Sequence, residues 1–291
     1  IFFISFFSIF FYFLGNNAED YSIYHLTHIQ SINQEKIVIG LVNLKSNLGQ
    51  SSISFYGDAL FQNLPFIQSP INYVSYFVLS GLVLFLNNLI KIKKIYEVQD
   101  YIFLIASLFF ILKFSRLGSH GGDFISPVLI IFGLYFFIQI KLFKINNQNN
   151  DKNIFYCLLF ISTAYFFKIF SIFYYFLVLI IFILLIKKKY LKKFYKIFIL
   201  IIFVNLIFFI KNILITGCII FPISTTCFDD LAWSMNKENV QQWKLLNEAW
   251  TKGWYNYFDL NFDEYIKNFN WINFWIKKQF IKSLEIIFIP I

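Results

Sequence analysis

The sequence predicts an all-α integral membrane protein, a multi-span helical bundle with a large first outer loop, and two observations predict it. The first is composition: 58% of the 291 residues are hydrophobic, 14% are charged and the mean hydropathy is +0.64, whereas soluble domains carry about 25% charged residues. The second is that apolar residues form uninterrupted blocks, such as 169–186 and 197–210, which contain no charge. A span needs about 20 mostly apolar residues, because hydrocarbon offers the backbone no hydrogen-bond partner.

The apolar blocks give an ordered set of predicted spans. They lie near 1–14, 71–90, 101–114, 124–140, 154–167, 169–186 and 197–216, and 284–291 is predicted to begin a further one. We therefore expect a transmembrane bundle over 1–216 with an outer loop at 15–70, then a Trp-rich outer segment at 217–283. Both ends of the chain lie within apolar runs, so we expect a fragment truncated at both ends. The first run lacks the basic region and the cleavage site of a signal peptide.

Basic residues gather in three short loops that all fall on one side of the predicted spans. Twelve of the 25 Lys and Arg residues lie there, namely Lys91, Lys93, Lys94, Lys141, Lys144, Lys152, Lys187, Lys188, Lys189, Lys192, Lys193 and Lys196. The positive-inside rule makes that side cytoplasmic. The formal charge of +9 is thus mostly a topology signal, and we expect no nucleic-acid partner. All three His and all six Trp residues lie on the opposite, outer side.

Two of the predicted spans are short for a bilayer. Tyr101–Leu112 is an apolar run of twelve residues, which covers about 18 Å of a hydrocarbon core about 30 Å thick. Ile154–Phe167 is little longer. One interpretation is that the loop at 115–123 and the turn at Lys168 dip into an outward-facing cavity. Helix tilt or local bilayer thinning is the alternative.

The first outer loop opens with an acidic pair, Glu19 and Asp20, directly after the first apolar run. A carboxylate at the membrane surface can act as a general base or orient an acceptor hydroxyl. If Asp20 opens a helix, Tyr24 and His28 follow it at i, i+4 steps on the same face. The alternative interpretation is that Asp20 only caps that helix.

Two histidines of this loop are candidate substrate-binding residues. His25 and His28 could also ligate a divalent cation with Asp20, or could simply pack against the neighbouring tyrosines. No zinc motif and no acidic cation loop accompanies them. A divalent cation therefore stays an open possibility, the metal stays unknown, and no cofactor is assigned.

The second outer loop carries several polar groups beside glycines within nine residues, Ser115–Asp123. Arg116 is the only Arg in the chain, and its planar fork of donors suits a phosphate. His120 is a further candidate for substrate binding. Asp123 is a candidate catalytic carboxylate, or it merely caps the following helix. Glycines allow tight turns and close approach of the backbone to a ligand.

Two lysines interrupt long apolar runs near the outer side. Lys168 and Lys211 could pair with a lipid phosphate or with Asp20 and Asp123, because ionisable residues within spans are costly and commonly functional. The alternative is that their stems snorkel to the interface.

Two cysteines and a series of tryptophans mark the last outer segment. Cys218 and Cys227 are a disulfide candidate, since they lie close in sequence on the oxidising side. Cys157 lies within a predicted span and is interpreted as a packing residue. The tryptophans between Trp233 and Trp275 could line a carbohydrate site or lie on the bilayer, since Trp favours that interface.

Several of these motifs occur in an order that resembles an uncharacterised family of bacterial multi-pass membrane proteins related to GT-C glycosyltransferases. The motifs are Asp20-x-x-x-Tyr24-His25-Leu26, Gly40-Leu-Val-Asn43, Gly121-Gly-Asp123, Lys168, Lys211-Asn212, Gly217-Cys218, Phe221-Pro222, Thr226-Cys227-Phe228 and Trp233-Ser234. The resemblance covers nearly the whole chain. One departure is that the family's second-loop motif is more usually Gly-Thr-Asp, and Gly122 stands in place of the Thr.

The resemblance implies an enzyme that takes a sugar from a polyprenyl phosphate or pyrophosphate on the outer face of the bacterial inner membrane. GT-C enzymes hold essential carboxylates in the first outer loop, and Glu19-Asp20 matches that position. Carried over, Asp20 would be the catalytic carboxylate, with Arg116, Lys168 and Lys211 as phosphate partners. The implied partners are membrane lipid, a lipid-linked sugar donor and a glycan or lipid acceptor.

Two hypotheses of other classes stay open. A transporter or flippase of a lipid-linked or anionic solute predicts polar residues near the bilayer midplane and internal repeats, and no repeat is visible in the sequence. A non-catalytic component of polysaccharide export would leave the clustered Asp, His and Arg residues without a role. The leading hypothesis is therefore a membrane glycosyltransferase of envelope glycan synthesis.

Overall fold

The computed structural model describes residues 21–35, 37–50, 52–62, 72–92, 97–113, 121–140, 148–254 and 261–280. Within them every regular element is a helix, and the only β-type pairing is an isolated bridge between Cys218 and Cys227. The predicted spans at 1–14 and 284–291 lie outside the described residues, as do Glu19, Asp20, Arg116 and His120. The chain divides into unit 1, residues 1–37 and 51–208, and unit 2, residues 38–50 and 209–291.

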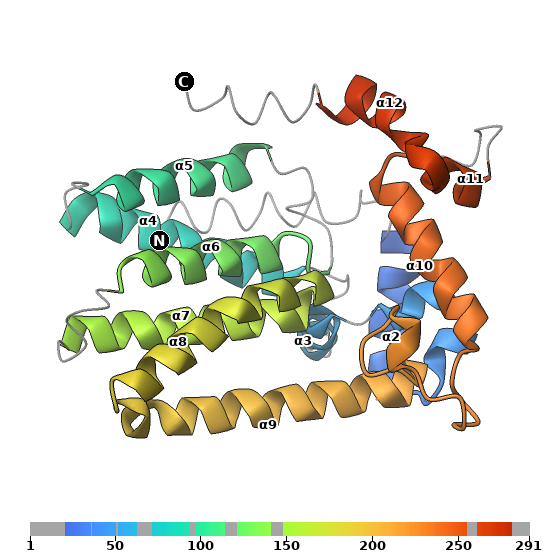
Figure 1. The fold of residues 1–291 in the computed structure, drawn as a ribbon, viewed down its shortest axis with the longest axis horizontal. Coiled ribbons are helices and arrows are strands. Elements are labelled where there is room, and N and C mark those ends of the chain that lie inside the picture. Colours follow the sequence, from blue (N-terminus) through green and yellow to red (C-terminus); the bar gives the residue numbers. More distant parts are fainter. Residues whose placement is uncertain are drawn as a thin grey trace. The chain divides into compact units, whose positions relative to one another are not determined.

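Unit 1 contains most of the helices (Figure 1). In chain order they are the π-helix Tyr21–His25, α2 Leu26–Glu35, α3 Ile53–Gln62, α4 Tyr73–Ile92, α5 Val98–Lys113, α6 Ile125–Ile138, α7 Gln148–Phe167, the 3-10 helix η5 Ile169–Tyr174, α8 Tyr175–Lys187 and the first part of α9 Leu191–Thr216. Five of the predicted spans each overlap one or two of these helices, namely 71–90, 101–114, 124–140, 169–186 and 197–216.

One predicted helix is longer than its apolar run. The short span expected at Ile154–Phe167 lies within α7, which begins earlier, at Gln148, and has 20 residues. That length corresponds to about 30 Å of helix axis. The added turns are polar, yet Asn150 is buried and Asp151 pairs with Lys193 of α9. Tertiary contacts thus extend the helix beyond the apolar pattern.

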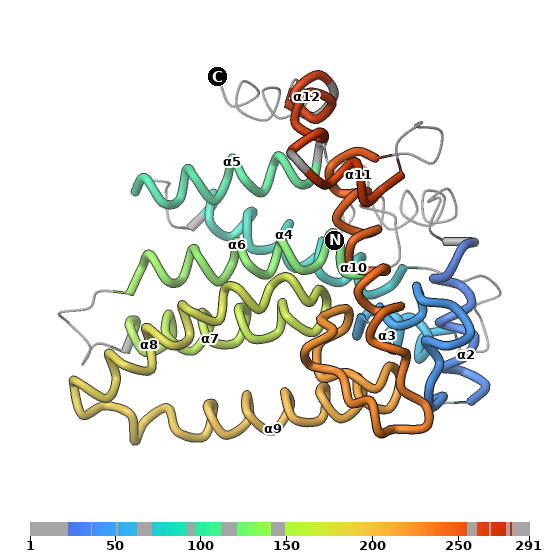
Figure 2. Tube along the Cα trace, turned by 45° about the vertical axis from the view of Figure 1, so that its right-hand side comes forward, coloured from blue at the N-terminus to red at the C-terminus, as the bar shows by residue number. Residues whose placement is uncertain are grey.

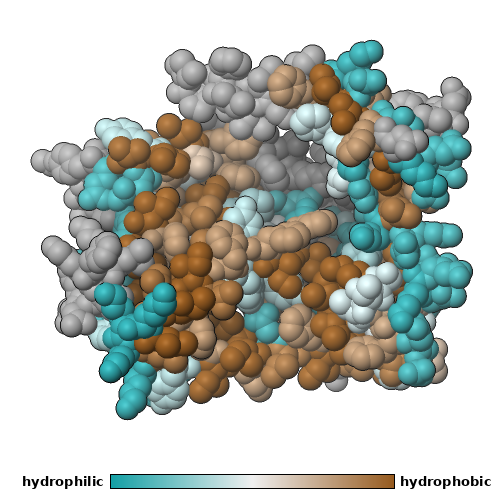
Figure 3. All heavy atoms as spheres, viewed as in Figure 1, coloured by the Kyte–Doolittle hydropathy of each residue, from teal (hydrophilic) through white to brown (hydrophobic). Residues whose placement is uncertain are grey.

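Among the described residues, three helices are long and apolar enough to cross a membrane: Tyr73–Lys91, Ile169–Lys187 and Leu191–Thr216. The third exposes large apolar side chains along its length; Phe203 is 59% exposed and Ile210 is 57% exposed. Figure 3 shows apolar atoms spread over much of the visible face of unit 1, with hydrophilic atoms over the α8–α9 turn. Soluble monomers rarely expose contiguous apolar surface on this scale. The described chain therefore has the properties of a helical membrane protein.

Unit 1 has two hydrophobic cores. The first joins α4, α5 and α6 through residues such as Leu82, Phe103 and Phe132. The second joins α7, α8 and α9 through residues such as Leu158 and Ile181. Figures 1 and 2 both show α6, α7 and α8 running side by side. Close side-by-side packing fixes which helix ends come together, and so it positions the polar residues described below.

Unit 2 is built around the end of α9 and the segment that follows it. Its helices are the 3-10 helices Leu41–Asn43, Ser46–Gly49 and Ser224–Thr226, then α10 Lys237–Thr251, α11 Phe262–Ile266, the 3-10 helix Lys267–Phe269, α12 Trp271–Trp275 and the π-helix Ile276–Phe280. Cys218 and Cys227, the candidate pair of the sequence analysis, form a disulfide. They pack with Val42, Phe221 and Val240 in one core.

The segment 38–50 belongs to unit 2 through specific hydrogen bonds. The Gly40 N–H donates to the Leu214 carbonyl at 2.8 Å, and the Asn43 side chain donates to the Trp233 carbonyl at 2.8 Å. The Gln50 amide donates to Asn247 at 3.1 Å. The outer loop predicted at 15–70 is thus shared between the two units.

Candidate functional site

Two of the charged residues that the sequence analysis placed near the outer side, Asp123 and Lys168, meet where α6 begins and α7 ends. The Lys168 ammonium forms an ion pair with the Asp123 carboxylate. A hydrogen bond between the Ser126 and Ser171 hydroxyls, both buried, joins the same two segments. The side chains of Lys168 and Asp123 are 41% and 24% exposed. A charged pair accessible to solvent therefore stands on a buried polar support.

Asp123 does not cap α6. The N-cap of α6 is Phe124, and no side chain caps this helix. Asp123 instead stands just before the positive end of α6, and Lys168 stands just after the negative end of α7, positions where helix dipoles favour an anion and a cation respectively. The interpretation of Asp123 as the cap of α6 is therefore wrong. Its carboxylate forms an ion pair with Lys168 instead.

Gly122 allows the two segments to approach this closely. A Cβ atom at Gly122 would lie 1.9 Å from the Phe167 carbonyl oxygen, a distance that no side chain could occupy. The Thr that is more usual at this position in the resembled family would therefore collide with the last turn of α7. The close approach that brings Asp123 to Lys168 therefore requires a glycine at position 122.

His25 lies beneath the same loop. Its side chain is 4% exposed, and its Nε2 atom would lie 3.5 Å from a Cβ at Gly121, which has φ +111°. The imidazole also packs against Tyr24 and Phe55, with ring centroids 4.2 Å and 5.1 Å apart. We call His25, Gly121, Gly122, Asp123 and Lys168 the junction site.

His28 has a different environment from His25. It is fully buried, with its ring centroid 4.8 Å from that of Phe55, and it lies on α2 beside Ile29 in a small apolar core. Packing, one of the two alternatives for the histidines, describes these contacts. Within the part of the chain that the structure describes, no group of three His, Cys, Asp or Glu side chains could hold a metal ion.

Asp58 is a buried carboxylate that the sequence analysis did not single out. It is fully buried on α3, and it accepts a hydrogen bond from the Val74 N–H at the start of α4, at 3.3 Å. Asn72 caps the same helix by accepting from the Ser75 N–H at 3.2 Å. The only sequence signal was an acid within the apolar run 53–62. Nearby on α3, burial raises the pKa of Tyr56 to about 12, so its hydroxyl is protonated at neutral pH.

The remaining candidates lie in unit 2. Lys211 is half-buried on α9, next to Asn212, whose side chain donates to the Ile219 carbonyl at 3.2 Å. The tryptophans mostly pack on each other and on neighbouring rings: Trp243 lies against Trp250 at 5.8 Å, and the Lys252 ammonium lies 4.6 Å from the Trp271 ring. Trp233 donates to the Ile213 carbonyl at 3.0 Å. In the described residues, these contacts support unit 2 internally.

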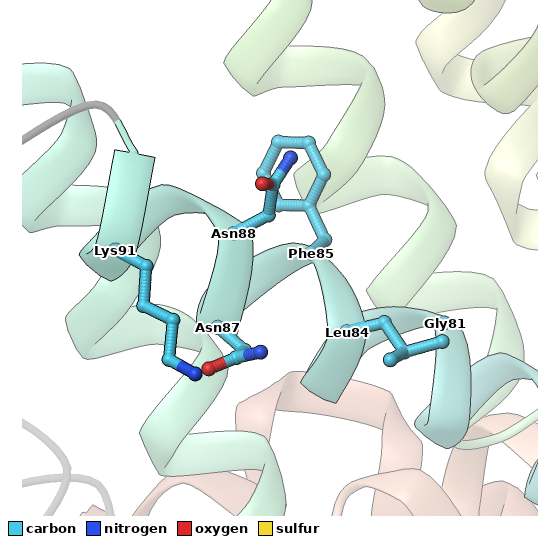
Figure 4. A pocket seen from close by; sticks show the side chains of 6 residues that line it. All are labelled: Gly81, Leu84, Phe85, Asn87, Asn88 and Lys91. Atoms are coloured by element: carbon cyan, nitrogen blue, oxygen red, sulfur yellow. The ribbon is translucent and has the colours of Figure 1, made fainter. Parts of the chain in front are cut away.

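A hollow on α4 does not belong to the junction site. It has a volume of about 660 Å³ and is lined by six residues of α4 alone, among them Asn87, Asn88 and Lys91 (Figure 4). Lys91 belongs to one of the basic loops that mark the predicted cytoplasmic side. A hollow lined by one helix is open to its surroundings and encloses no reacting groups.

Fold and site together define a helical protein with helices long and apolar enough to cross a membrane and a charged pair where two of its helices meet. The chain belongs to a family described as a domain of unknown function, DUF8201, whose model matches residues 1–291. No curated protein and no solved structure matches the chain.

Proposed function

We propose that this protein is a membrane glycosyltransferase of the bacterial inner membrane. It transfers a sugar from a polyprenyl-phosphate-type donor to an envelope glycan or lipid acceptor on the outer face. The observation that supports this most is the junction site, in which an accessible ammonium and an accessible carboxylate form an ion pair, and the His25 imidazole lies against Gly121 of the same site. The resemblance to GT-C proteins supplies the donor class.

The charges of the junction site fit the two ends of such a reaction. An acceptor oxygen forms a bond to the anomeric carbon while the bond from that carbon to the phosphate oxygen breaks. The acceptor proton passes to a carboxylate, for which Asp20 is the proposed base and Asp123 the second candidate. The leaving polyprenyl phosphate keeps the electron pair and is stabilised by Lys168, with Arg116 as a further partner.

The ion pair in the structure is consistent with a site that binds an anionic substrate. Asp123 holds the ammonium of Lys168 close to α6, and both side chains are partly exposed. An arriving phosphate would compete with Asp123 for that ammonium and release the carboxylate. Exposed pairs of this kind contribute under about 1 kcal/mol to stability, so their exchange costs little.

The test is sugar transfer by full-length protein expressed in its own host or a close relative. Lys168→Met, Asp123→Asn and Asp20→Asn are each expected to lower transfer from a labelled polyprenyl-linked sugar by about 100-fold or more. The matched control is Asp229→Asn, which breaks an exposed ion pair with Lys237 in unit 2. Transfer should persist in that control.

The amount of each variant protein in the membrane is measured alongside, so that a loss of transfer is not a loss of protein. Unchanged transfer by both Lys168→Met and Asp20→Asn would contradict the proposal. Uptake of a lipid-linked or anionic solute by proteoliposomes, without sugar transfer, would favour the transporter hypothesis instead.

A further inference from the structure

A second hollow lies at the other end of α7, where α7 and α9 begin. Its volume is about 340 Å³. It is lined by lysines and by apolar side chains, namely Lys152, Lys193, Lys196, Phe155, Phe194 and Ile197. All of these residues lie in unit 1, in the basic region that the positive-inside rule places on the cytoplasmic side.

The charges around this hollow do not cancel. Lys193 forms an ion pair with Asp151 through one carboxylate oxygen, while the other oxygen, Oδ1, is buried and makes no hydrogen bond in the described structure. Lys152 and Lys196 are exposed, and no carboxylate of the described residues pairs with either of them. Three ammonium groups and one carboxylate thus leave an excess of positive charge facing the hollow.

The surroundings of the hollow change from charged to apolar along the helices. Phe155 of α7 is 43% exposed. Beyond Lys196, α9 continues with Ile199 and Leu200, which are 59% and 55% exposed, and with Phe203. An ammonium cluster beside exposed apolar side chains matches an amphipathic anion, with a charged head and hydrocarbon tails.

We propose that this hollow binds the phosphate headgroup of an anionic phospholipid from the cytoplasmic leaflet. Lys152 and Lys196 contact the phosphate, Lys193 remains oriented by Asp151, and the acyl chains lie against Phe155 and the exposed face of α9. Basic pockets between membrane helices on the cytoplasmic side commonly recognise anionic lipid headgroups.

The test measures binding of phosphatidylglycerol to the purified full-length protein in detergent by native mass spectrometry. Lys152→Gln with Lys196→Gln is expected to weaken phosphatidylglycerol binding roughly 30-fold, because each lysine near a membrane surface contributes on the order of a fivefold factor. The control is Lys188→Gln with Lys192→Gln, which removes two exposed charges of the same basic region that do not line the hollow. It is expected to weaken binding by less than about threefold.

Two further arms identify the ligand. Phosphatidylcholine is expected to bind the wild type much more weakly than phosphatidylglycerol, and millimolar inorganic phosphate is expected to leave the phosphatidylglycerol complex intact. Equal weakening by the two double variants would overturn the proposal, because the lysines would then act only as surface charge. Displacement by inorganic phosphate would also overturn it, because the site would then take a free anion.

Discussion

At the residue scale, the contacts of the junction site depend on one missing side chain. Gly122 lies so close to the Phe167 carbonyl that a Cβ atom there would overlap it. The same approach brings the Asp123 carboxylate to the Lys168 ammonium and the Ser126 hydroxyl to that of Ser171. Any larger residue at position 122 must therefore separate α6 from the end of α7.

Gly122→Thr is expected to lower the free energy of unfolding by about 1–3 kcal/mol, the usual cost of overpacking. Thermal unfolding in detergent measures the change. Gly81→Ala is the matched control, because a Cβ at Gly81 meets no atom within 4 Å. Alanine within α4 should leave stability unchanged or raise it by up to about 1 kcal/mol. Equal stability of the two variants would contradict the close approach.

The sequence predicted which charged residues of the junction site could pair, but not the packing around them. Asp123 and Lys168 could be named because charges at the ends of apolar runs are unusual, and pairing between them was one of the alternatives. The role of Gly122 could not be predicted, since it depends on the carbonyl of Phe167, which lies 45 residues further along the chain. Asp58 was missed for the same reason: its partner, the Val74 N–H, belongs to another helix.

At the element scale, α9 carries the clearest sign of a lipid environment. Its 26 residues have a charge-free middle, and Phe203, Leu206 and Ile207 are all more than half exposed. In water this surface would be unfavourable by about 25 cal/mol for each Å² of apolar area. In a bilayer the same side chains contact hydrocarbon chains, which are apolar as well.

Phe203→Asp is expected to make membrane insertion of α9 less favourable by about 2.5–3.5 kcal/mol, the cost of a charge at the centre of a span. An insertion assay with glycosylation sites on both sides of the segment measures it. Phe203→Leu is the control and should insert like the wild type. Unchanged insertion of the Asp variant would contradict a span centred near this residue.

The disulfide fixes the turn that follows α9. Cys218 and Cys227 are separated by nine positions and pack in the core of unit 2. Replacing both with Ser is expected to lower the stability of this unit by about 2–4 kcal/mol. Thermal unfolding checks the change. Alkylation of the denatured, unreduced protein provides the other check: only Cys157 should react, and modification of all three cysteines would contradict the pairing.

Helices lie where the sequence has long apolar runs, and one of them extends beyond its run. The span predicted near 154–167 follows six polar residues. In the structure those residues continue the helix, with Asn150 buried and Asp151 paired to Lys193. A periodicity argument sees only apolar residues, so it cannot detect a turn stabilised by polar partners from another helix.

At the scale of the whole molecule, the chain combines two units that the order of the sequence does not separate. Segment 38–50 lies within the predicted first outer loop, yet its hydrogen bonds reach Leu214, Trp233 and Asn247. No local signal announces such contacts, because they join positions far apart in the chain. The predicted membrane orientation, in contrast, rests on a local signal, the distribution of lysines.

The two proposed sites require that the two ends of α7 face opposite sides of the membrane. The junction site then faces the outer side, where a lipid-linked sugar donor is proposed to bind, and the basic hollow faces the cytoplasm. Lys168, directly after α7, marks the end of that helix. Lys188, in the turn between α8 and α9, marks the side on which α7 begins.

The measurement that tests this most directly is cysteine labelling from each side of the membrane. Lys168→Cys and Lys188→Cys are made in a protein whose buried Cys157 is replaced by Ala, and intact cells are treated with a membrane-impermeant maleimide. The account predicts that position 168 is labelled in intact cells, and that position 188 is labelled only after the membrane is permeabilised. Labelling of position 188 in intact cells, with position 168 protected, would contradict it.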